Sequence, residues 1–266
     1  MPKLGQHFLH NQSVVNKIIN ELAVTKGEVV IEIGPGEGAL TLPLLSACEK
    51  KGALLIAVER DNELADAFSL AHPDDKVEII RGDVLKALPA IVSRPGFAPV
   101  GYKIVGNIPY YITGHLLRVV GELERKPSRV VIMIQREVAK RLTAKPPEMN
   151  LLAAATQFWA DTRLIANLKP GDFTPPPKVH SAVVGLSVRP TAREVSGEDY
   201  YRTIKVLFKQ PRKTILNNIA EAIPKEKRSM TAPFLDGIMI KSGSRPQDLS
   251  ISDILRLASK LPALLA

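Results

Sequence analysis

The chain has 266 residues, of which 45% are hydrophobic and 24% charged, proportions that are ordinary for a soluble globular protein. Its longest apolar runs are strand-sized, its N-terminus carries no secretory signal and its single cysteine, Cys48, excludes an internal disulfide, so we expect a cytoplasmic protein that does not span a membrane. The formal net charge of +9 favours an anionic partner, of which nucleic acid is the commonest.

Residues 28–135 alternate short β-branched runs with longer stretches of helical spacing. The runs predict strands, and the stretches that follow them predict helices. The predicted strands are 29–34, 53–59, 76–82, 102–107 and 129–135, and the predicted helices are 39–51, 62–71, 115–123 and 137–144. Strands that alternate with crossover helices form a parallel, doubly wound α/β sheet.

The pattern changes in the second half of the chain. Residues 162–169 and 180–188 predict two more strands, which we place at the sheet edge and which bring the sheet to seven, mostly parallel strands. After residue 190 strand signals nearly vanish, and helical spacing returns at 200–209, 213–223 and 251–262. We therefore predict a Rossmann-like domain over 1–190 and a small helical domain over 191–266, which carries 13 Lys and Arg against 8 Asp and Glu.

Three predicted strands end in residues suited to a nucleotide. Gly34 and Gly36 follow the first strand, where glycine lets the backbone turn tightly and approach a ligand. Glu59 ends the second strand, where a carboxylate can accept hydrogen bonds from both ribose hydroxyls of an adenosine. Asp83 ends the third and can accept from an adenine amino group, or simply cap the next helix. These features suit NAD and S-adenosylmethionine equally.

The fourth predicted strand ends in residues 107–111, Asn-Ile-Pro-Tyr-Tyr. The Asn107 side-chain oxygen and a carbonyl near Pro109 can accept the two N–H bonds of an adenine amine, which stabilises the positive charge that develops when the nitrogen is methylated. Tyr110 can stack on the base, and Phe173, close to three consecutive prolines, can form a rigid aromatic wall or simply pack within its loop. An ordinary Asn-Pro turn with aromatic packing is the alternative interpretation.

Together these motifs resemble the ribosomal RNA adenine N6-dimethyltransferase family of the KsgA type, to which the Erm resistance methylases are related. The resemblance runs from Gly5 to about Arg189. It rests on residues 5–9, 32–38, 59, 82–83, 107–110, 135–139 and 173–179.

The resemblance implies an enzyme that transfers methyl groups from S-adenosylmethionine to N6 of adenines in ribosomal RNA. It implies a cofactor site formed by Gln6, His7, Leu9, Gly34, Gly36, Glu59, Asp83, Val84 and Asn107. It also implies that the catalytic site around the target adenine is formed by Asn107, Pro109, Tyr110 and Phe173. The helical domain is expected to recognise the RNA, and the enzyme is expected to act as a monomer.

Three departures from the family pattern concern charge. His7 stands where the family usually has Asn, so a side-chain contact there would become pH-sensitive, whereas a backbone contact would survive. Gly185 replaces a frequent Arg, and residues 210–213, Gln-Pro-Arg-Lys, replace a familiar Arg-Arg-Lys stretch. The last two changes remove positive charge from surfaces expected to face RNA.

The leading hypothesis is dimethylation of adenines in small-subunit (16S-type) ribosomal RNA within an immature subunit. It is favoured by the intact segment 175–179 and by the basic C-terminal segment. The alternatives are an Erm-like large-subunit enzyme, a non-catalytic ribosome assembly factor and a nicotinamide-dependent dehydrogenase. The five histidines are scattered and never joined by the cysteine at ligand spacing, so no metal site is predicted.

Overall fold

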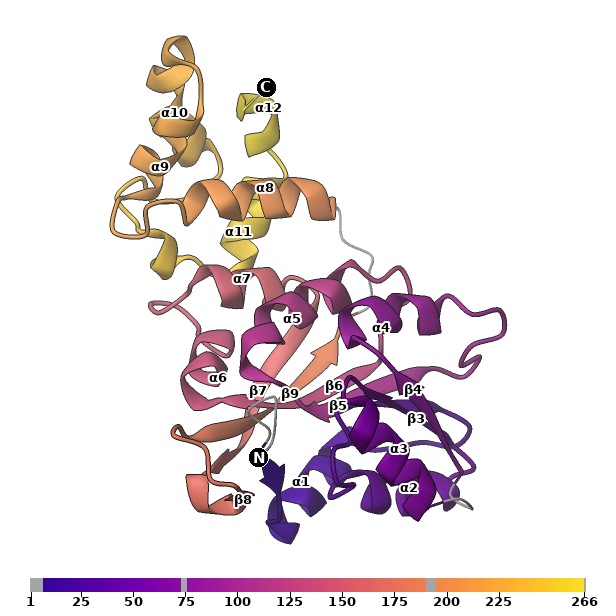
Figure 1. Cartoon of the computed structure of the whole chain (residues 1–266). Helices are drawn as coiled ribbons and strands as arrows, with labels where there is room; N and C mark the ends of the chain where they lie inside the picture. The colour runs from indigo at the N-terminus through magenta and orange to yellow at the C-terminus, as the bar shows by residue number, and fades with distance from the viewer. Residues whose placement is uncertain (1–6, 73–75, 190–194, 266) are drawn as a thin grey trace. The chain divides into compact units, whose positions relative to one another are not determined.

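The computed structural model describes residues 7–72, 76–189 and 195–265, which form two compact units (Figure 1). The sheet unit comprises Met1–Lys140 and Ala160–Val188, and the helical unit comprises Arg141–Trp159 and Arg189–Ala266. This division differs from a single boundary at 190, because the chain enters the helical unit once before it forms the last two strands of the sheet.

A seven-stranded sheet lies at the centre of the sheet unit, in the order β4-β3-β2-β5-β6-β9-β7. Its strands are β2 (Val29–Ile33), β3 (Leu54–Glu59), β4 (Val77–Arg81), β5 (Tyr102–Asn107), β6 (Arg129–Gln135), β7 (Ala160–Leu168) and β9 (Ser181–Val188). Strands β2 to β6 pair in parallel, and β9 runs antiparallel to both β6 and β7. The predicted α/β class is confirmed. Of the two late strands that we expected at the sheet edge, β7 lies there, whereas β9 is inserted between β6 and β7.

Helices cover both faces of this sheet (Figure 1). One face carries α1 (Gln12–Leu22), α2 (Thr41–Glu49) and α3 (Asn62–Ala71), and the other carries α4 (Val84–Val92) and α5 (Thr113–Glu122). Helix α6 (Arg136–Leu142) continues directly from β6. Because both faces are covered, β2 is buried at every position and β6 at its five central positions, which explains their continuous apolar sequences.

A second, two-stranded sheet attaches the N-terminal segment to the loop after β7. Strand β1 (Phe8–Leu9) pairs antiparallel with β8 (Phe173–Thr174), with Phe8 opposite Thr174 and Leu9 opposite Phe173. Asn11 caps α1 with its side-chain oxygen, and its Nδ2 donates to Oδ1 of Asp172 at 2.7 Å. Residues 8–11 and 172–174, which are far apart in the sequence, thus lie side by side.

The helical unit has its own hydrophobic core. It contains α7 (Leu151–Gln157), α8 (Gly197–Leu207), α9 (Ile215–Ala222), α10 (Thr231–Gly237), α11 (Ile251–Ala258) and α12 (Leu261–Leu265). Helix α7 belongs to this unit because Ala153 and Ala154 are fully buried in that core, and because the hydroxyl of Tyr200 donates to the Ala154 carbonyl at 3.0 Å. No helix in the described part of the chain is long and apolar enough to cross a membrane.

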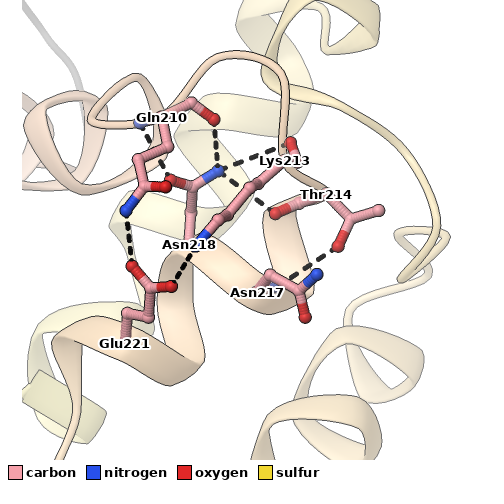
Figure 2. A network of polar contacts seen from close by, with 6 residues as sticks. All are labelled: Gln210, Lys213, Thr214, Asn217, Asn218 and Glu221. Carbon is pink, nitrogen blue, oxygen red and sulfur yellow. Dashed lines mark hydrogen bonds and ion pairs between the residues drawn. The ribbon is translucent and has the colours of Figure 1, made fainter.

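The turn between α8 and α9 is held by one buried side chain, Asn218 (Figure 2). Its Oδ1 accepts from the amide of Gln210 at 3.1 Å, and its Nδ2 donates to the carbonyls of Gln210 and Thr214, each at 3.1 Å. Glu221, one turn further along α9, accepts from Nε2 of Gln210 at 2.7 Å and pairs with Nζ of Lys213. The stretch that departs from the family pattern is therefore a fixed turn in which the lysine charge is matched by Glu221.

Candidate functional site

A pocket opens where β2, β3 and β5 end at their carboxyl ends, the edge at which nucleotides bind in sheets of this kind. Eight residues that the sequence predicted for the functional site line this pocket: His7, Leu9, Gly34, Gly36, Glu59, Asn107, Pro109 and Tyr110. It is also lined by Phe8, Glu32, Pro35, Ala39, Leu40, Arg60, Ile108, Tyr111 and Met133. Three predicted motifs and the N-terminal segment therefore meet around one space.

The glycine turn and Glu59 form the end of the pocket suited to an adenosine. Gly34 and Gly36 have φ of +69° and +56°, a left-handed conformation that favours glycine. A Cβ on Gly36 would lie 2.8 Å from a ring carbon of Phe8, so a larger residue would collide with the pocket wall. The buried carboxylate of Glu59 accepts from the amide of Gly36 at 3.2 Å and from that of Asp61 at 2.9 Å. These bonds fix the carboxylate beside the turn.

Asn107 is oriented by the backbone of the N-terminal segment. Its Nδ2 donates one of its two N–H groups to the carbonyl oxygen of His7 at 2.9 Å, which orients the amide, and the side-chain oxygen is the acceptor of this group. The imidazole of His7 instead contacts the carbonyl of Pro175 through Nδ1 at 2.7 Å. The contact to Asn107 is thus a backbone one, which any residue at position 7 could make.

A backbone carbonyl next to Asn107 is free to serve as a second acceptor. The carbonyl of Pro109 accepts from the amide of Ile112 at 3.0 Å and closes a short 3₁₀ turn, Tyr110–Ile112. Among the described residues, no backbone amide bonds to the carbonyl of Ile108, which also lines the pocket. The acceptor expected near Pro109 is therefore best matched by Ile108.

Tyr110 is half-buried and its hydroxyl is fixed. The hydroxyl lies 2.9 Å from Oγ of Ser181, the fully buried first residue of β9. This bond holds the ring at the pocket beside Asn107, as a stacking platform for a planar base requires.

Three of the expected residues that the structure describes, Phe173, Asp83 and Val84, do not line the pocket. Phe173 is only 3% exposed and packs in a core cluster with Leu9 and Leu168, because its pairing with β1 turns it inward. Asp83 caps α4 by accepting from the amide of Leu85 at 2.9 Å, which is the alternative that its sequence position allowed. Val84 is buried in the first turn of that helix, and Gln6 lies outside the described residues.

Arg60 and Tyr111 line the pocket although the sequence motifs did not single out either side chain. Nη1 of Arg60 donates to the Tyr111 hydroxyl at 2.8 Å, and both residues are exposed. The bond joins the residue after Glu59 to the turn after Asn107, which are 51 positions apart. The sequence could have indicated these two residues only because Arg60 follows Glu59 and Tyr111 follows Tyr110, both of which were predicted to lie at the site.

Glu32 is the most deeply buried charged residue of the pocket, with 1% of its surface exposed. Burial raises the pKa of its carboxyl to about 8; the Thr41 side chain opposes this shift and the negative charge of Glu59 adds to it. The Thr41 hydroxyl lies near this carboxyl without making a hydrogen bond of good geometry to it, and neither that hydroxyl nor Oε2 of Glu32 has another hydrogen-bond partner among the described residues. A buried polar atom without a partner is costly, so Glu32 is an exception to the usual pairing of buried polar groups.

The described residues contain no cluster of three or more His, Cys, Asp or Glu side chains that could hold a metal ion. The donors of the pocket are instead carboxylates, an amide oxygen and backbone groups. This set suits an organic ligand that carries ribose hydroxyls and positive charge.

Comparisons with known proteins agree with this geometry. A family model described as ribosomal RNA adenine dimethylase matches residues 1–261. The chain is 37% identical over 255 residues to ribosomal RNA small subunit methyltransferase A of Dehalococcoides mccartyi, covering 94% of this chain and 84% of the relative. It is 34% identical over 265 residues to the protein of the same name from Bacillus licheniformis, covering 97% and 90%.

Two solved structures share the fold. A dimethyladenosine transferase from Plasmodium falciparum has a TM-score of 0.77 at 23% identity, over 94% of this chain and 96% of that one. The 23S rRNA methyltransferase ErmE has a TM-score of 0.74 at 23% identity, over 96% of this chain and 99% of that one.

Proposed function

Because the chain belongs to the ribosomal RNA adenine dimethylase family, we propose that it transfers methyl groups from S-adenosylmethionine to N6 of adenines in small-subunit ribosomal RNA. The product would be N6,N6-dimethyladenosine. The observation that carries the proposal is the Asn107 side chain, whose nitrogen is engaged by His7 while its oxygen remains for an N–H donor in the pocket.

The pocket fits S-adenosylmethionine on its own geometry. The carboxylate of Glu59 lies beside the glycine turn, where it can accept from ribose hydroxyls, and Gly34 and Gly36 form this turn with positive φ angles that favour glycine. His7 and Leu9 line the pocket near Asn107 and would contact the methionine end. Asp83 and Val84 would take part only by reaching the adenine from the first turn of α4.

When bound, S-adenosylmethionine supplies an electrophilic methyl group on a sulfonium. The chain's own residues act on the adenine. The Asn107 oxygen and the Ile108 carbonyl accept the two N6–H bonds, which favours a nitrogen with an available lone pair and stabilises the charge that develops there. Tyr110, fixed by Ser181, stacks on the base and holds it for in-line transfer. No strong base is required, since the methylated amine loses its proton to water.

The small-subunit target is supported by the relatives, several of which are named ribosomal RNA small subunit methyltransferase A at 30–37% identity. We propose that the substrate is an immature subunit in the cytoplasm and that the protein acts as a monomer. Residues 191–266, with 13 Lys and Arg against 8 Asp and Glu, would supply electrostatic affinity for its RNA.

The test is methyl transfer from labelled S-adenosylmethionine to undermethylated small subunits, with large-subunit RNA as a parallel substrate. We expect label in small-subunit RNA, recovered as N6,N6-dimethyladenosine. Asn107→Ala should reduce the rate by about 10²- to 10³-fold, the loss typical of one preorganised electrostatic group. Asn16→Ala, which alters an exposed residue of α1, is the matched control and should retain the rate.

The other outcomes separate the alternative functions. Label in large-subunit RNA alone would replace the proposal with an Erm-like enzyme. Cofactor binding without label in either RNA would favour a non-catalytic assembly factor. Binding of a nicotinamide cofactor in place of S-adenosylmethionine would indicate a dehydrogenase.

A further inference from the structure

Arg60 is a charged residue of the pocket that the proposed methyl transfer does not use. It directly follows Glu59, the last residue of β3, and it lines the pocket with an exposed side chain. Its Nη1 donates to the hydroxyl of Tyr111 at 2.8 Å, and Tyr111 is itself 67% exposed. This bond costs rotamer freedom, which an arginine that is only solvated would keep.

The bond between Arg60 and Tyr111 joins two sides of the pocket across the end of β2. In the sheet, β2 lies between β3, which Arg60 follows, and β5, which leads into the turn that carries Tyr111. The glycine turn begins at the end of β2, and Tyr110, the expected platform for the base, directly precedes Tyr111. The guanidinium therefore lies at the exposed rim of the pocket, between the adenosine end and the platform.

The charge of Arg60 is not neutralised by any carboxylate of the described residues. The neighbouring acids are engaged by backbone amides: Glu59 accepts from Gly36 and Asp61, and Asp61 caps α3. A guanidinium has five N–H donors, and the bond to Tyr111 uses one of them. Positive charge and further donors at an exposed rim suit an anion that arrives from solvent.

The proposed reaction brings two kinds of anion to the pocket, the carboxylate of S-adenosylmethionine and the phosphates of RNA. The carboxylate belongs to the methionine end, which is expected beside His7 and Leu9, whereas Arg60 adjoins Glu59 at the adenosine end. When the target base stacks on Tyr110, its sugar and phosphates stay outside the base pocket. The phosphate is therefore the anion that fits the rim.

We propose that Arg60, oriented by Tyr111, binds a backbone phosphate of the target adenosine and so positions the extruded nucleotide. This inference rests on the proposed function, because it takes RNA as the substrate. Arginine suits the role, since its planar guanidinium can donate two parallel hydrogen bonds to one phosphate. The Tyr111 hydroxyl fixes the plane of that group before the RNA arrives. No covalent bond forms or breaks at Arg60, so it is a positioning residue.

The experiment is filter binding of undermethylated small subunits at several salt concentrations, with S-adenosylhomocysteine in the cofactor site. Arg60→Gln should weaken binding by about tenfold at low salt, the loss typical of one charge-assisted contact. It should also lower the slope of log affinity against log salt by about 1. Arg60→Lys keeps the charge without the planar fork, so it should keep the slope and recover part of the affinity. Both variants should bind S-adenosylmethionine as the unaltered protein does, which shows that their pockets are intact.

Arg94→Gln is the matched control. Arg94 is also an exposed arginine of the sheet unit, but it does not line the pocket. Its Nη1 pairs at 2.7 Å with Glu78, near the amino end of β4, whereas the pocket lies at the carboxyl ends of the strands. Its replacement should change neither the affinity nor the salt slope.

Competition by small nucleotides identifies the phosphate. Adenosine, adenosine 5′-monophosphate and adenosine 3′-monophosphate are compared as inhibitors of methyl transfer at saturating S-adenosylmethionine. One of the two monophosphates should inhibit the unaltered protein about tenfold more strongly than adenosine does, as a charge-assisted contact predicts. Arg60→Gln should lose this preference.

An unchanged salt slope in Arg60→Gln, or a monophosphate preference that it retains, would overturn the inference and leave the proposed function standing. Equal inhibition of the unaltered protein by adenosine and both monophosphates would also overturn it. Weaker binding of S-adenosylmethionine by Arg60→Gln would do the same, because Arg60 would then act on the cofactor. If the unaltered protein neither binds nor methylates small subunits, the proposed function fails first and the role of Arg60 fails with it.

Discussion

The hydroxyl of Tyr110 lies 2.9 Å from Oγ of Ser181, and this bond joins the end of β5 to the start of β9 across 71 residues. Ser181 does not line the pocket, but through this bond it holds the ring of Tyr110, which does. Ser181 is fully buried, so its hydroxyl faces no water that could replace Tyr110.

Ser181→Ala should lower kcat for methyl transfer by about tenfold, the equivalent of one lost hydrogen bond of 1–1.5 kcal/mol, and leave affinity for the cofactor unchanged. The reason is that the tyrosine ring would lose its fixed position while the cofactor residues stay in place. Single-turnover kinetics and cofactor titration measure the two quantities. Ser187→Ala, near the other end of β9, is the control.

Tyr110→Phe combined with Ser181→Ala completes a double-mutant cycle. Because both changes break one bond, their effects on kcat should be far from additive. Additive losses would show that the two hydroxyls act independently.

Gly185→Ala should destabilise the sheet unit. A Cβ at position 185 would lie 2.8 Å from Oε1 of Glu21, a buried carboxylate paired with Arg163 and, at 3.4 Å, with Arg129. Overpacking of this kind costs about 1–3 kcal/mol, which denaturant unfolding can measure. Gly243→Ala, which meets nothing within 4 Å, is the matched control, and an equal loss there would contradict the explanation.

Position 185, where the family often has an arginine, lies beside Glu21. Two arginines from β6 and β7 already reach this carboxylate. The positive charge is thus supplied from positions 129 and 163, and glycine leaves the space that the ion pairs occupy.

Glu32→Gln should stabilise the protein increasingly as the pH rises from 5 to 8. Because burial raises the folded-state pKa of Glu32 from 4.5 to about 8, the folded state holds a proton that the unfolded chain releases above 4.5. Stability from this group is therefore complete below pH 4.5 and is lost as the pH rises to about 8. A glutamine removes that loss.

Thermal unfolding of both proteins at pH 5, 6.5 and 8 measures the difference. The exposed Glu124→Gln should show no such pH dependence relative to the unaltered protein. A constant difference between Glu32→Gln and the unaltered protein at all three pH values would contradict the assignment.

Binding of RNA should be weakened by salt, and exposed charges of the turn after α8 should contribute unequally. Arg212 is exposed and makes no ion pair within the described part of the chain, whereas Lys213 pairs with Glu221 (Figure 2). Arg212→Gln should lower the slope of log affinity against log salt by about 1, and Lys213→Gln by clearly less. Filter binding at several salt concentrations measures the slopes, and equal slopes would contradict the role of Glu221.

The sequence predicted the sheet well because its strands are buried on both faces, so their apolar runs stand out locally. Strands β5 and β6 have the expected bounds of 102–107 and 129–135. Helix α4 escaped prediction, and it carries Pro89 in its interior. The pairing of β1 with β8 joins residues more than 160 positions apart, and no local pattern records such a contact.

The predicted site residues also differ in whether a local sequence pattern or a contact between distant residues decides their position. Gly34, Glu59 and Asn107 line the pocket because strand ends in a parallel sheet meet at one edge. The direction of Phe173 depends on its partner in β1, so an aromatic beside prolines looked like a pocket wall although it is buried in the core. Glu32 belonged to a motif that the sequence revealed. That its Oε2 is buried without a hydrogen-bond partner could not be predicted, because this burial depends on the whole folded sheet.

The chain crosses between the two units three times. It enters the helical unit at Arg141–Trp159, returns to the sheet unit, and enters the helical unit again at Arg189–Ala266. Neither unit is therefore a continuous piece that truncation can release. A protein cut after residue 188 would keep α7 without the helices that bury Ala153 and Ala154. Independent expression of the catalytic half requires the excision of 141–159 and a short linker from Lys140 to Ala160, in addition to the new C-terminus.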